Sequence, residues 1–557
     1  MPGPKVLRPA ATIVLVRERL AGMELLFLQR SPSAPHFAGA YVFPGGTLEE
    51  GDRDPELYRR VLGVAAEEAD RRLNVAGGAL GFWVACVREC YEEAGILLAV
   101  DEQHRPISAR RLEALTRQRD ALNAGTLQFK DFLLQENLFI PAAQMVYFAH
   151  WITPPVQPRR FDTRFFLSQA PADQPVQHDN TEIVGSCWMR PSEAFERVKR
   201  DEIKMVRATR AIVTGLGNYA TPAEALAQLS AVTHVAMNRP CLAQGRDGPR
   251  LFGAGDAQYA EIHWVDPEES GESTYDLLPD VPKRLDRYVV RMLAPNPGFM
   301  TGPGTNTYIV GERELIVIDP GPADSAHIAA IVAASAGRIR WIVLTHTHRD
   351  HSPGATSLRE ATGAQIAGRS GRSQSPHDGH VALDRVLADG DVVRCDGVEL
   401  QVVHTPGHAS NHLCYLLTQT RMLFTGDHVI QGSTVVIAPP DGNMTAYLRS
   451  LQRVKELDVA ILAPGHGYLI GQPHREVSRL IAHRLAREAK VRAAISEAGG
   501  QATLEALLPR VYDDVPAAIH PVAARSLRAH LEKMVEDGEL SVGEDVWISR
   551  PTAIPSA

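Results

Sequence analysis

The stretch Thr345-His346-Thr347-His348-Arg349-Asp350-His351 places four potential metal ligands within six residues. It directly follows the apolar run at residues 341–344, which predicts a buried strand. A strand that ends in a ligand-rich loop delivers side chains to the edge of a sheet, where a metal and its substrate can meet. Neutral imidazoles and a carboxylate suit zinc, iron or manganese. The stretch therefore predicts a metal centre at the end of a strand.

The same order, an apolar run and then a ligand, recurs further along the chain. His408 follows residues 400–403, Asp427 follows residues 422–423, and His466 follows residues 459–463. Four such steps in this order resemble the metallo-β-lactamase fold family, and within it the glyoxalase-II-type members that hold two metals. The resemblance covers about residues 287–472, and all seven ligand positions of the family pattern are filled.

This resemblance implies a ligand set and a chemistry. Asp427 would bridge two metals, and Asp350 would also be a catalytic residue. The remaining implied ligands are His346, His348 and His408 for one metal, and Asp350, His351 and His466 for the other. Two zinc ions, or iron or manganese in their place, would share a water whose pKa falls from about 15.7 to about 7. His404 and His412 have no ligand position in the pattern, so we expect them to support the ligands or to pack.

The first half of the chain indicates a different metal chemistry, in Arg88-Glu89-Cys90-Tyr91-Glu92-Glu93-Ala94-Gly95-Ile96. On a helix, Glu89, Glu92 and Glu93 fall on one face. Three crowded carboxylates repel one another unless a hard cation such as Mg²⁺ or Mn²⁺ neutralises them. Gly95 predicts the end of the helix. The alternative is a charged helix face that water covers.

The segment Phe43-Pro44-Gly45-Gly46-Thr47-Leu48-Glu49-Glu50-Gly51-Asp52 lies upstream of this helix. Together the two segments resemble the Nudix box, whose second half is matched in full. The resemblance implies hydrolysis of a nucleoside diphosphate linked to another group, by charge neutralisation and positioning. It implies catalytic roles for Glu93 and for Arg88, which would orient a neighbouring glutamate, and substrate binding at Gly45 and Gly46.

The box departs from the usual pattern in two ways. Asp52 stands where a glutamate is usual, and residues 53–87 separate the halves, 35 residues in place of the usual seven. An interrupted box resembles the peroxisomal coenzyme A diphosphatase branch of the Nudix proteins, which makes coenzyme A derivatives candidate substrates. Pro35, however, occupies the place of an arginine in the coenzyme A signature. Arg159 and Arg160 are candidate phosphate contacts, or paired arginines on a solvated strand.

The predicted fold class is an α+β multidomain chain. Its parts are a Nudix α/β/α sandwich at residues 1–215, a connector at 216–285, a metallo-β-lactamase αββα sandwich at 286–478 and a winged helix at 479–552. The connector is rich in glycine and acidic residues, and residues 261–264 are consistent with an added strand. The winged helix rests on helical patterns at 483–497, 503–511 and 522–537 and a hairpin at 540–548. It resembles the C-terminal appendage of lactamase-β-like endoribonucleases.

Composition narrows the partners and the location. The net charge of −8 gives no general attraction to nucleic acid or anionic lipid, and residues 480–550 carry nine basic against eleven acidic side chains. Nucleic acid is therefore an unfavoured partner of the tail, beside packing, dimerisation or substrate shaping. No apolar stretch is long enough to span a bilayer, and no signal-peptide core or Ser-Lys-Leu terminus is present. Six scattered cysteines without a Cys-x-x-Cys motif favour a reducing cytoplasm.

Three functional hypotheses follow. The favoured one is a bifunctional metal-dependent hydrolase, in which a Nudix diphosphatase for coenzyme A or a nucleotide-like substrate joins a two-metal hydrolase of an ester, thioester or phosphodiester. The second is an RNA-processing endoribonuclease whose winged helix holds the RNA. The third keeps the Nudix unit as a binding or regulatory module beside a single catalyst. A single-iron dioxygenase is disfavoured, because Asp350, His351 and His466 provide for a second metal.

Overall fold

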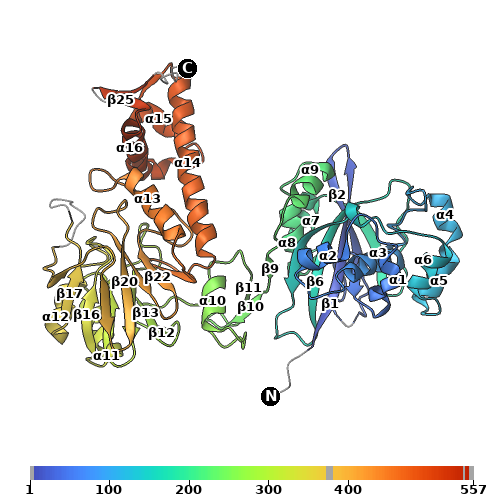
Figure 1. The fold of residues 1–557 in the computed structure, drawn as a ribbon, viewed down its shortest axis with the longest axis horizontal. Helices are drawn as coiled ribbons and strands as arrows, with labels where there is room; N and C mark the ends of the chain where they lie inside the picture. Colours follow the sequence, from blue (N-terminus) through green and yellow to red (C-terminus); the bar gives the residue numbers. More distant parts are fainter. Residues whose placement is uncertain (1–5, 35, 372–379, 544–545, 551–557) are drawn as a thin grey trace. The chain divides into compact units, whose positions relative to one another are not determined.

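The structure is a computed structural model that describes residues 6–34, 36–371, 380–543 and 546–550. The chain divides into two compact units, Met1–Pro240 and Cys241–Ala557, and many of their elements are labelled in Figure 1. Across these described ranges, no helix combines the length and the apolar character that a membrane crossing requires. Pro35, one of the departures noted above, lies outside the described residues.

The first unit is built on one mixed sheet with helices on both faces. Its strands are β1 (Leu7–Arg19), β2 (Gly22–Arg30), β3 (Ala40–Val42), β4 (Gly45–Thr47), β5 (Val146–Ile152), β6 (Arg160–Gln169), β7 (Ile183–Met189), β8 (Lys204–Met205) and β9 (Met237–Asn238). Its helices are α1 (Pro55–Tyr58), α2 (Ala66–Leu73), α3 (Leu80–Ala94), α4 (Ala109–Ala114), α5 (Thr116–Asn123), α6 (Phe129–Gln135), α7 (Pro191–Lys199), α8 (Arg207–Leu216) and α9 (Pro222–Ser230). The sheet order is β8-β3-β2-β1-β6-β5-β9, with β4 beside β1 and β7 beside β2.

Strand β1 explains why both faces of this sheet are covered. Ile13 and Leu15 belong to one core, which they share with α3, whereas Val14 and Val16 belong to a second core with α7, α8 and α9. Because successive side chains of a strand point to opposite faces, one apolar run supplies both cores. The predicted α/β/α sandwich is confirmed, and the insert within the box forms α1, α2 and the start of α3.

The second unit contains two sheets that pack face to face. Its strands are β10 (Cys241–Ala243), β11 (Arg250–Phe252), β12 (Lys283–Arg284), β13 (Val289–Leu293), β14 (Asn306–Gly311), β15 (Leu315–Ile318), β16 (Ile339–Val343), β17 (Gln365–Gly368), β18 (Arg385–Val386), β19 (Val392–Cys395), β20 (Val398–His404), β21 (Leu413–Leu417), β22 (Met422–Gly426) and β23 (Ile461–Pro464). The helices of this part are α10 (Tyr259–Val265), α11 (Ser325–Ser335), α12 (Gly354–Thr362) and α13 (Met444–Lys455). Strands β12 to β18 form one sheet and β19 to β23 the other.

The core between these two sheets takes side chains from both, for example Ile316 and Val343 from one and Val402 and Phe424 from the other. Helices α11 and α12 cover the outer face of the first sheet, where Ile331 and Leu358 are buried. Helix α13 covers the outer face of the second sheet. The result is the predicted αββα sandwich.

The C-terminal part consists of α14 (Pro473–Glu497), α15 (Leu504–Val511) and α16 (His520–Glu536) with a small sheet in the order β24 (Gln501–Thr503), β26 (Val546–Ser549), β25 (Leu540–Gly543). Helix α14 spans 25 residues and leads from the two-sheet core to the small sheet (Figure 1). It begins at Pro473, ten residues before the helical pattern at residue 483 and inside the predicted lactamase boundary. Proline is well suited to a first helical turn because its missing N–H would have no partner there.

The segment predicted as a connector at residues 216–285 is divided between the two units. Helix α9 belongs to the first unit, where Ala225 is buried in the core. The predicted strand at residues 261–264 is wrong, because these residues lie in helix α10. Glu261 of that helix is fully buried and pairs with Arg291 and Lys283. Because a buried carboxylate is stable only when it is paired, these contacts fix the helix on strand β13.

Candidate metal centres

The predicted ligands of the second unit lie in loops at the ends of four strands. The loop after β16 carries His346, His348, Asp350 and His351, and those after β20, β22 and β23 carry His408, Asp427 and His466. These loops bring two groups of ligand atoms together: His346, His348 and His408 in one, and Asp350, His351, Asp427 and His466 in the other. Within each group the atoms lie within 4.8 Å of one another. All seven predicted ligands thus meet at one edge of the two-sheet core.

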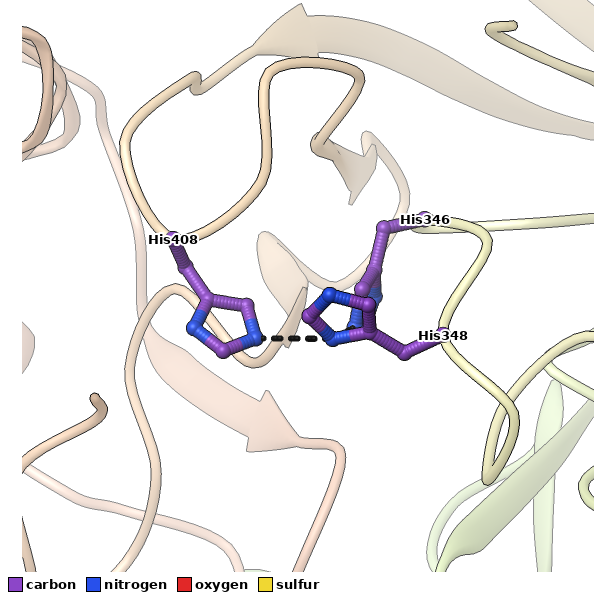
Figure 2. Close-up of side chains that lie close together, drawn as sticks. All are labelled: His346, His348 and His408. Atoms are coloured by element: carbon purple, nitrogen blue, oxygen red, sulfur yellow. Dashed lines mark hydrogen bonds between the residues drawn. The ribbon is translucent and has the colours of Figure 1, made fainter. Parts of the chain in front are cut away.

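The three histidines of the first group point their ring nitrogens toward one another (Figure 2). The Nδ1 atom of His348 lies 2.9 Å from Nε2 of His346 and 3.1 Å from Nε2 of His408. A tetrahedral zinc with bonds of about 2.0–2.1 Å would hold two such nitrogens about 3.3 Å apart. The histidines therefore stand close to the separation that a metal ion requires.

Asp427 faces both groups at once. Its Oδ2 lies 3.6 Å from Nε2 of His408, in the three-histidine group. Its Oδ1 lies 3.5 Å from Nε2 of His351 and 3.3 Å from Nε2 of His466, in the other group. Asp350 Oδ2 lies 3.5 Å from Nε2 of His351 and 3.4 Å from Nε2 of His466. One carboxylate with an oxygen on each side is the arrangement that a bridging ligand needs.

Each of four histidines is fixed from behind by a hydrogen bond. The Nδ1 atom of His351 lies 2.9 Å from Asp319 Oδ2, that of His408 lies 2.8 Å from Val436 O, and that of His466 lies 3.1 Å from Gly304 O. His346 Nδ1 contacts Thr345 Oγ1 at 3.0 Å. A ring that donates through Nδ1 keeps a lone pair on Nε2, as a metal ligand must.

Several of the atoms that face the common volume are buried and have no hydrogen-bond partner in the structure, namely His351 Nε2, His466 Nε2 and Asp427 Oδ1. Buried polar atoms without partners cost free energy and call for an explanation. Imidazole nitrogens and carboxylate oxygens are ligands for zinc, iron and manganese. The residues present therefore fit a pair of divalent metal ions.

The electrostatics of the two groups differ. Burial lowers the pKa of His348 to about 3 and that of His346 well below its ordinary value, and neighbouring imidazoles add to both effects. Burial alone would raise the pKa of Asp350, but His351 and His466 outweigh it and lower the pKa to about 2. Burial opposes a charge on His466, yet Asp427 and Asp350 raise its pKa to about 9. The second group thus favours positive charge, which a divalent cation supplies.

Asp319 is a site residue that the sequence analysis missed. Its carboxylate accepts hydrogen bonds from Thr345 N at 2.8 Å and Thr345 Oγ1 at 2.6 Å, in addition to the contact with His351. The signal was present, because Asp319 directly follows the apolar strand β15, as the predicted ligands follow theirs. A carboxylate behind a ligating histidine raises the basicity of the ring.

His404 and His412 lie outside both ligand groups of the described residues. Nε2 of His412 accepts the N–H of Asp427 at 3.2 Å, and its Nδ1 faces Thr405 Oγ1 at 2.9 Å. His412 therefore supports the backbone of Asp427, whereas His404 contacts the carbonyl of Ser410. Gly426 brings the chain into this position with φ of +45°, where a Cβ would lie 2.5 Å from Thr345 Oγ1.

In the first unit, Arg88 organises the predicted glutamates of α3. Its guanidinium is buried and binds both carboxylate oxygens of Asp52 at 3.0 Å. It also contacts Glu92 at 3.1 Å and Glu89 at 2.9 Å. Asp52, the departure from the usual box, thus serves as the paired partner of Arg88, itself buried. A bidentate pair of this kind fixes the plane of the guanidinium.

Gly45 and Gly46 contact the glutamates directly. The N–H of Gly45 donates to Glu93 at 2.9 Å, and a Cβ on Gly46 would lie 2.2 Å from Glu89 Oε1. Burial raises the pKa of Glu89 to about 7 despite the adjacent Arg88, and raises that of Glu93 well above its ordinary value. Carboxylates that resist ionisation favour a bound cation. Helix α3 ends at Gly95, which is in the left-handed conformation, as predicted.

The structure does not gather these glutamates as tightly as the ligands of the second unit. Among the described residues, the groups with ligand atoms within 4.8 Å are the two already described and Glu488, Asp537 and Glu539. Arg88 lies beside Glu89 and Glu92, while Glu93 turns toward Gly45. Lys533 and Arg492 pair with the third group, which makes it an ion-pair network.

Arg159 and Arg160, the predicted phosphate contacts, lie away from the glutamates. Arg160 is opposite Leu7 on β1, whereas Gly45 and Gly46 are opposite Thr12 and Ala11. Four to five residues along a strand correspond to roughly 13–17 Å. Nε of Arg160 donates to Thr153 O at 3.0 Å, and Arg159 is exposed. Their contact with phosphate stays a prediction.

Comparison with protein families gives three matches along the chain. The NUDT19 Nudix domain matches residues 53–208, the metallo-beta-lactamase superfamily matches residues 300–466, and the beta-lactamase associated winged helix domain matches residues 503–547. These ranges include α3 with its glutamates, all four ligand loops and α15 with α16.

Individual relatives match about half of the chain each. Beta-lactamase-like protein 2 homolog of Caenorhabditis elegans is 30% identical over 261 residues, which are 46% of this chain and 87% of the relative. Atrochrysone carboxyl ACP thioesterase of Aspergillus chevalieri is 33% identical over 287 residues, 49% of this chain and 87% of the relative. A crystal structure of a NUDIX hydrolase from Alicyclobacillus acidocaldarius is 27% identical with a TM-score of 0.34, covering 41% of this chain and 99% of that one.

Fold, ligand loops and relatives together define a metal-dependent hydrolase. The chain belongs to the metallo-β-lactamase superfamily, and it also carries a Nudix hydrolase domain and a β-lactamase-associated winged helix.

Proposed function

We propose that this chain is a bifunctional hydrolase, in which the second unit hydrolyses a thioester with two metal ions and the first unit is a Nudix diphosphatase. The observation that carries the proposal is Asp427, whose two carboxylate oxygens face two separate ligand groups. A single-metal enzyme would have no use for the second group of Asp350, His351 and His466. Zinc, iron and manganese all suit these ligands.

The residues of the second unit would divide the work. The ligands would hold two divalent ions, which would supply a water with a pKa lowered toward about 7 and a positive charge that polarises a carbonyl group. The Asp350 carboxylate, whose pKa is held near 2 by His351 and His466, stays ionised at neutral pH and orients the attacking water. Asp319 and Thr345 keep the ring of His351 and the loop after β16 in place.

A thioester is favoured among the candidate substrates because one relative, matched over 287 residues, is an atrochrysone carboxyl ACP thioesterase. The first unit supports the same substrate family. Its interrupted Nudix box resembles that of coenzyme A diphosphatases. Glu89, Glu92 and Glu93 would hold Mg²⁺ or Mn²⁺, and Arg88 positions Glu89 and Glu92. One half would then cleave an acyl-coenzyme A thioester and the other the diphosphate of coenzyme A.

Location and assembly stay predictions. The six cysteines, all within the described residues, form no disulfide bond with one another, which supports the predicted cytoplasmic location because thiols stay reduced there. A homodimer remains a second prediction.

The proposal is tested by product analysis of the purified full chain, supplied with zinc, manganese or magnesium. The substrates are an acyl-coenzyme A, coenzyme A, a nucleotide sugar and a short single-stranded RNA. We expect free thiol from the first and diphosphate cleavage of the second, and His348→Ala should abolish only thiol release. Metal-dependent cleavage of the RNA that is lost in His348→Ala, with no thioester hydrolysis, would establish the endoribonuclease alternative instead.

A further inference from the structure

We propose that Arg484 and Ser526, on the C-terminal helices α14 and α16, are positioning residues for His408, so that the winged-helix part belongs functionally to the three-histidine metal centre. This inference rests on the proposed two-metal function. It assigns a role to the C-terminal helices that neither a nucleic-acid surface nor a dimer contact would give them.

The link begins at the back of His408. Its Nδ1 atom contacts the carbonyl oxygen of Val436 at 2.8 Å, so the ring donates there and directs Nε2 toward His348 (Figure 2). The position of the Val436 carbonyl therefore sets both the tautomer and the orientation of the ring. Groups that hold a ligating histidine in this way typically change metal affinity by about 10–100-fold when they are removed.

Val436 lies in a segment without regular secondary structure, residues 435–437, which we call the strap. Nη2 of Arg484 donates to the carbonyl of Val435 at 2.5 Å. On the other side of Val436, Oγ of Ser526 accepts the N–H of Ile437 at 3.3 Å. Because backbone groups of a buried segment need partners, side chains of the two helices supply what a sheet would otherwise supply.

Both contacts to the strap are buried, and the one from Arg484 is also charged. Arg484 is 3% exposed and lies over the ring of Tyr447, 5.4 Å from its centroid. A hydrogen bond from a charged donor is about twice as strong as a neutral one. Val435 and Ile437 are themselves packed in the apolar core that contains residues of α13, α14 and α16. The strap therefore has little freedom to move independently of the helices.

Helix α16 also reaches the other side of His408. Oε1 of Glu536 accepts from Asn443 Nδ2 at 2.9 Å, and the N–H of Asn443 donates to the carbonyl of Gly407 at 2.8 Å. Gly407 directly precedes His408, so α16 braces both the loop that carries the ring and the strap behind it. Ser526 and Glu536 stand ten residues apart on this one helix. Helix α16 thus contacts both the strap behind His408 and, through Asn443, the loop that carries His408.

The test measures metal affinity of the full chain by titration of the metal-free protein with Zn²⁺ and with Co²⁺, whose absorption reports the ligand geometry. The variants are Arg484→Met and Ser526→Ala. Arg492→Met, which removes an exposed arginine of α14 that pairs with Glu539, and Ser478→Ala, which removes a hydroxyl bonded within α14, are the matched controls.

We expect Arg484→Met and Ser526→Ala each to lower the affinity for one of the two metals of the second unit by about tenfold, the lower end of the range for such groups. The Co²⁺ absorption spectrum of that metal position should also change. The other metal, the controls and the Nudix reaction should stay as in the wild type. Arg484→Lys, which keeps a charged donor, should recover part of the affinity.

Equal weakening of both metals together with a lower melting temperature would mean that the helices only stabilise the fold, and would overturn the inference. Unchanged affinity for both metals in both variants would overturn it as well. If the wild type itself takes up fewer than two metals in this unit, the proposed function fails, which is a distinguishable result.

Discussion

The two candidate metal centres of this chain arrange their charges in opposite ways. In the second unit, histidines are held from behind through Nδ1, and among the described residues the buried His351 Nε2 and His466 Nε2 atoms have no hydrogen-bond partner. In the first unit, the Arg88 guanidinium already contacts Glu89 and Glu92. These ring nitrogens of the second unit can therefore bind a metal, whereas the glutamates of the first unit are partly neutralised by Arg88.

The difference follows from how each centre is built. The ligands of the second unit come from four loops, so each needs its own support. For His351, His408 and His466, the groups that supply it lie 32, 28 and 162 residues away in the sequence. The glutamates of the first unit share one helix with Arg88, which pairs with Glu92 at i+4. A centre made from loops therefore depends more on the surrounding fold than a centre made on one helix.

The largest expected effect is at Asp427, which faces both ligand groups. Asp427→Ala should lower hydrolysis at the second unit by about 10³-fold or more, at or beyond the upper range for removal of one charge-stabilising group, and leave diphosphatase activity unchanged. Asp458→Ala, which removes an exposed partner of Arg421, is the control. Steady-state rates of both reactions decide the matter, and full activity of Asp427→Ala would refute the bridging role.

A smaller loss is expected at Glu93 of the Nudix helix. Glu93→Gln should reduce Mg²⁺- or Mn²⁺-dependent diphosphate cleavage by about 10²-fold, the lower range for a group that acts in proton transfer, because the amide keeps the shape but not the charge. The other reaction should be nearly intact, since the two sites lie in separate compact units and independent sites act additively. Glu67→Gln on α2 replaces an exposed glutamate as the control. Equal loss of both reactions would show that the two centres are not separate.

The candidate ligand residues of both centres were predictable from the sequence, because an apolar run followed by a polar residue is a local signal. It located the seven residues that the structure brings together, including His408 and His466 from distant loops. The same signal is present at Asp319, which went unnoticed because it carries no histidine beside it. Helix α3 was predictable for a similar reason, since its glutamates share one helical face.

The supporting contacts were not predictable. Val436, Arg484 and Ser526 lie 28, 76 and 118 residues after His408, and only the folded chain brings them behind its ring. The partner of Arg88 was equally hidden, because Asp52 looked like a departure from the usual box. The strand expected at residues 261–264 was wrong because the alternation of polar and apolar residues in Glu261-Ile262-His263-Trp264 is too short to distinguish a strand from a helix.

Glu261 differs from the carboxylates of the two candidate metal centres, because its buried oxygens are fully paired with protein cations. It accepts from Arg291 at 2.6 and 2.9 Å and from Lys283 at 2.7 Å. Glu261→Gln should lower the free energy of unfolding by about 3 kcal/mol, because two cations lose their counter-charge, without changing metal content. Glu312→Gln, in an exposed pair with Arg287, should cost less than about 1 kcal/mol. Denaturant titration measures both.

The same group predicts a pH dependence. Burial opposes the charge on Glu261, but Arg291 and Lys283 lower its pKa from 4.5 to about 2. A carboxyl group whose pKa is lower in the folded state than in the unfolded chain stabilises the fold at any pH above its unfolded pKa. That stabilisation is lost as the pH falls toward the folded pKa. The wild type should therefore lose stability between about pH 4.5 and pH 2 that Glu261→Gln does not lose. Parallel curves for the two proteins would contradict this account.

The smallest expected effect is that of salt on RNA binding. Basic side chains of the C-terminal part already face carboxylates, as Arg487 faces Asp514 and Lys490 faces Asp513, so few remain to meet phosphates. Short single-stranded RNA should bind weakly at low salt and little differently at physiological salt. Tight binding that weakens steeply with salt would reverse the preference for small substrates.

The central claim, a two-metal centre bridged by Asp427, is tested most directly by counting metals. The count is made on the full chain with Glu92→Gln and Glu93→Gln, so that the Nudix site contributes little. We predict two zinc, iron or manganese ions per chain, and fewer than two once Asp427→Ala is added. One ion or none before that change, or two ions after it, would contradict the account.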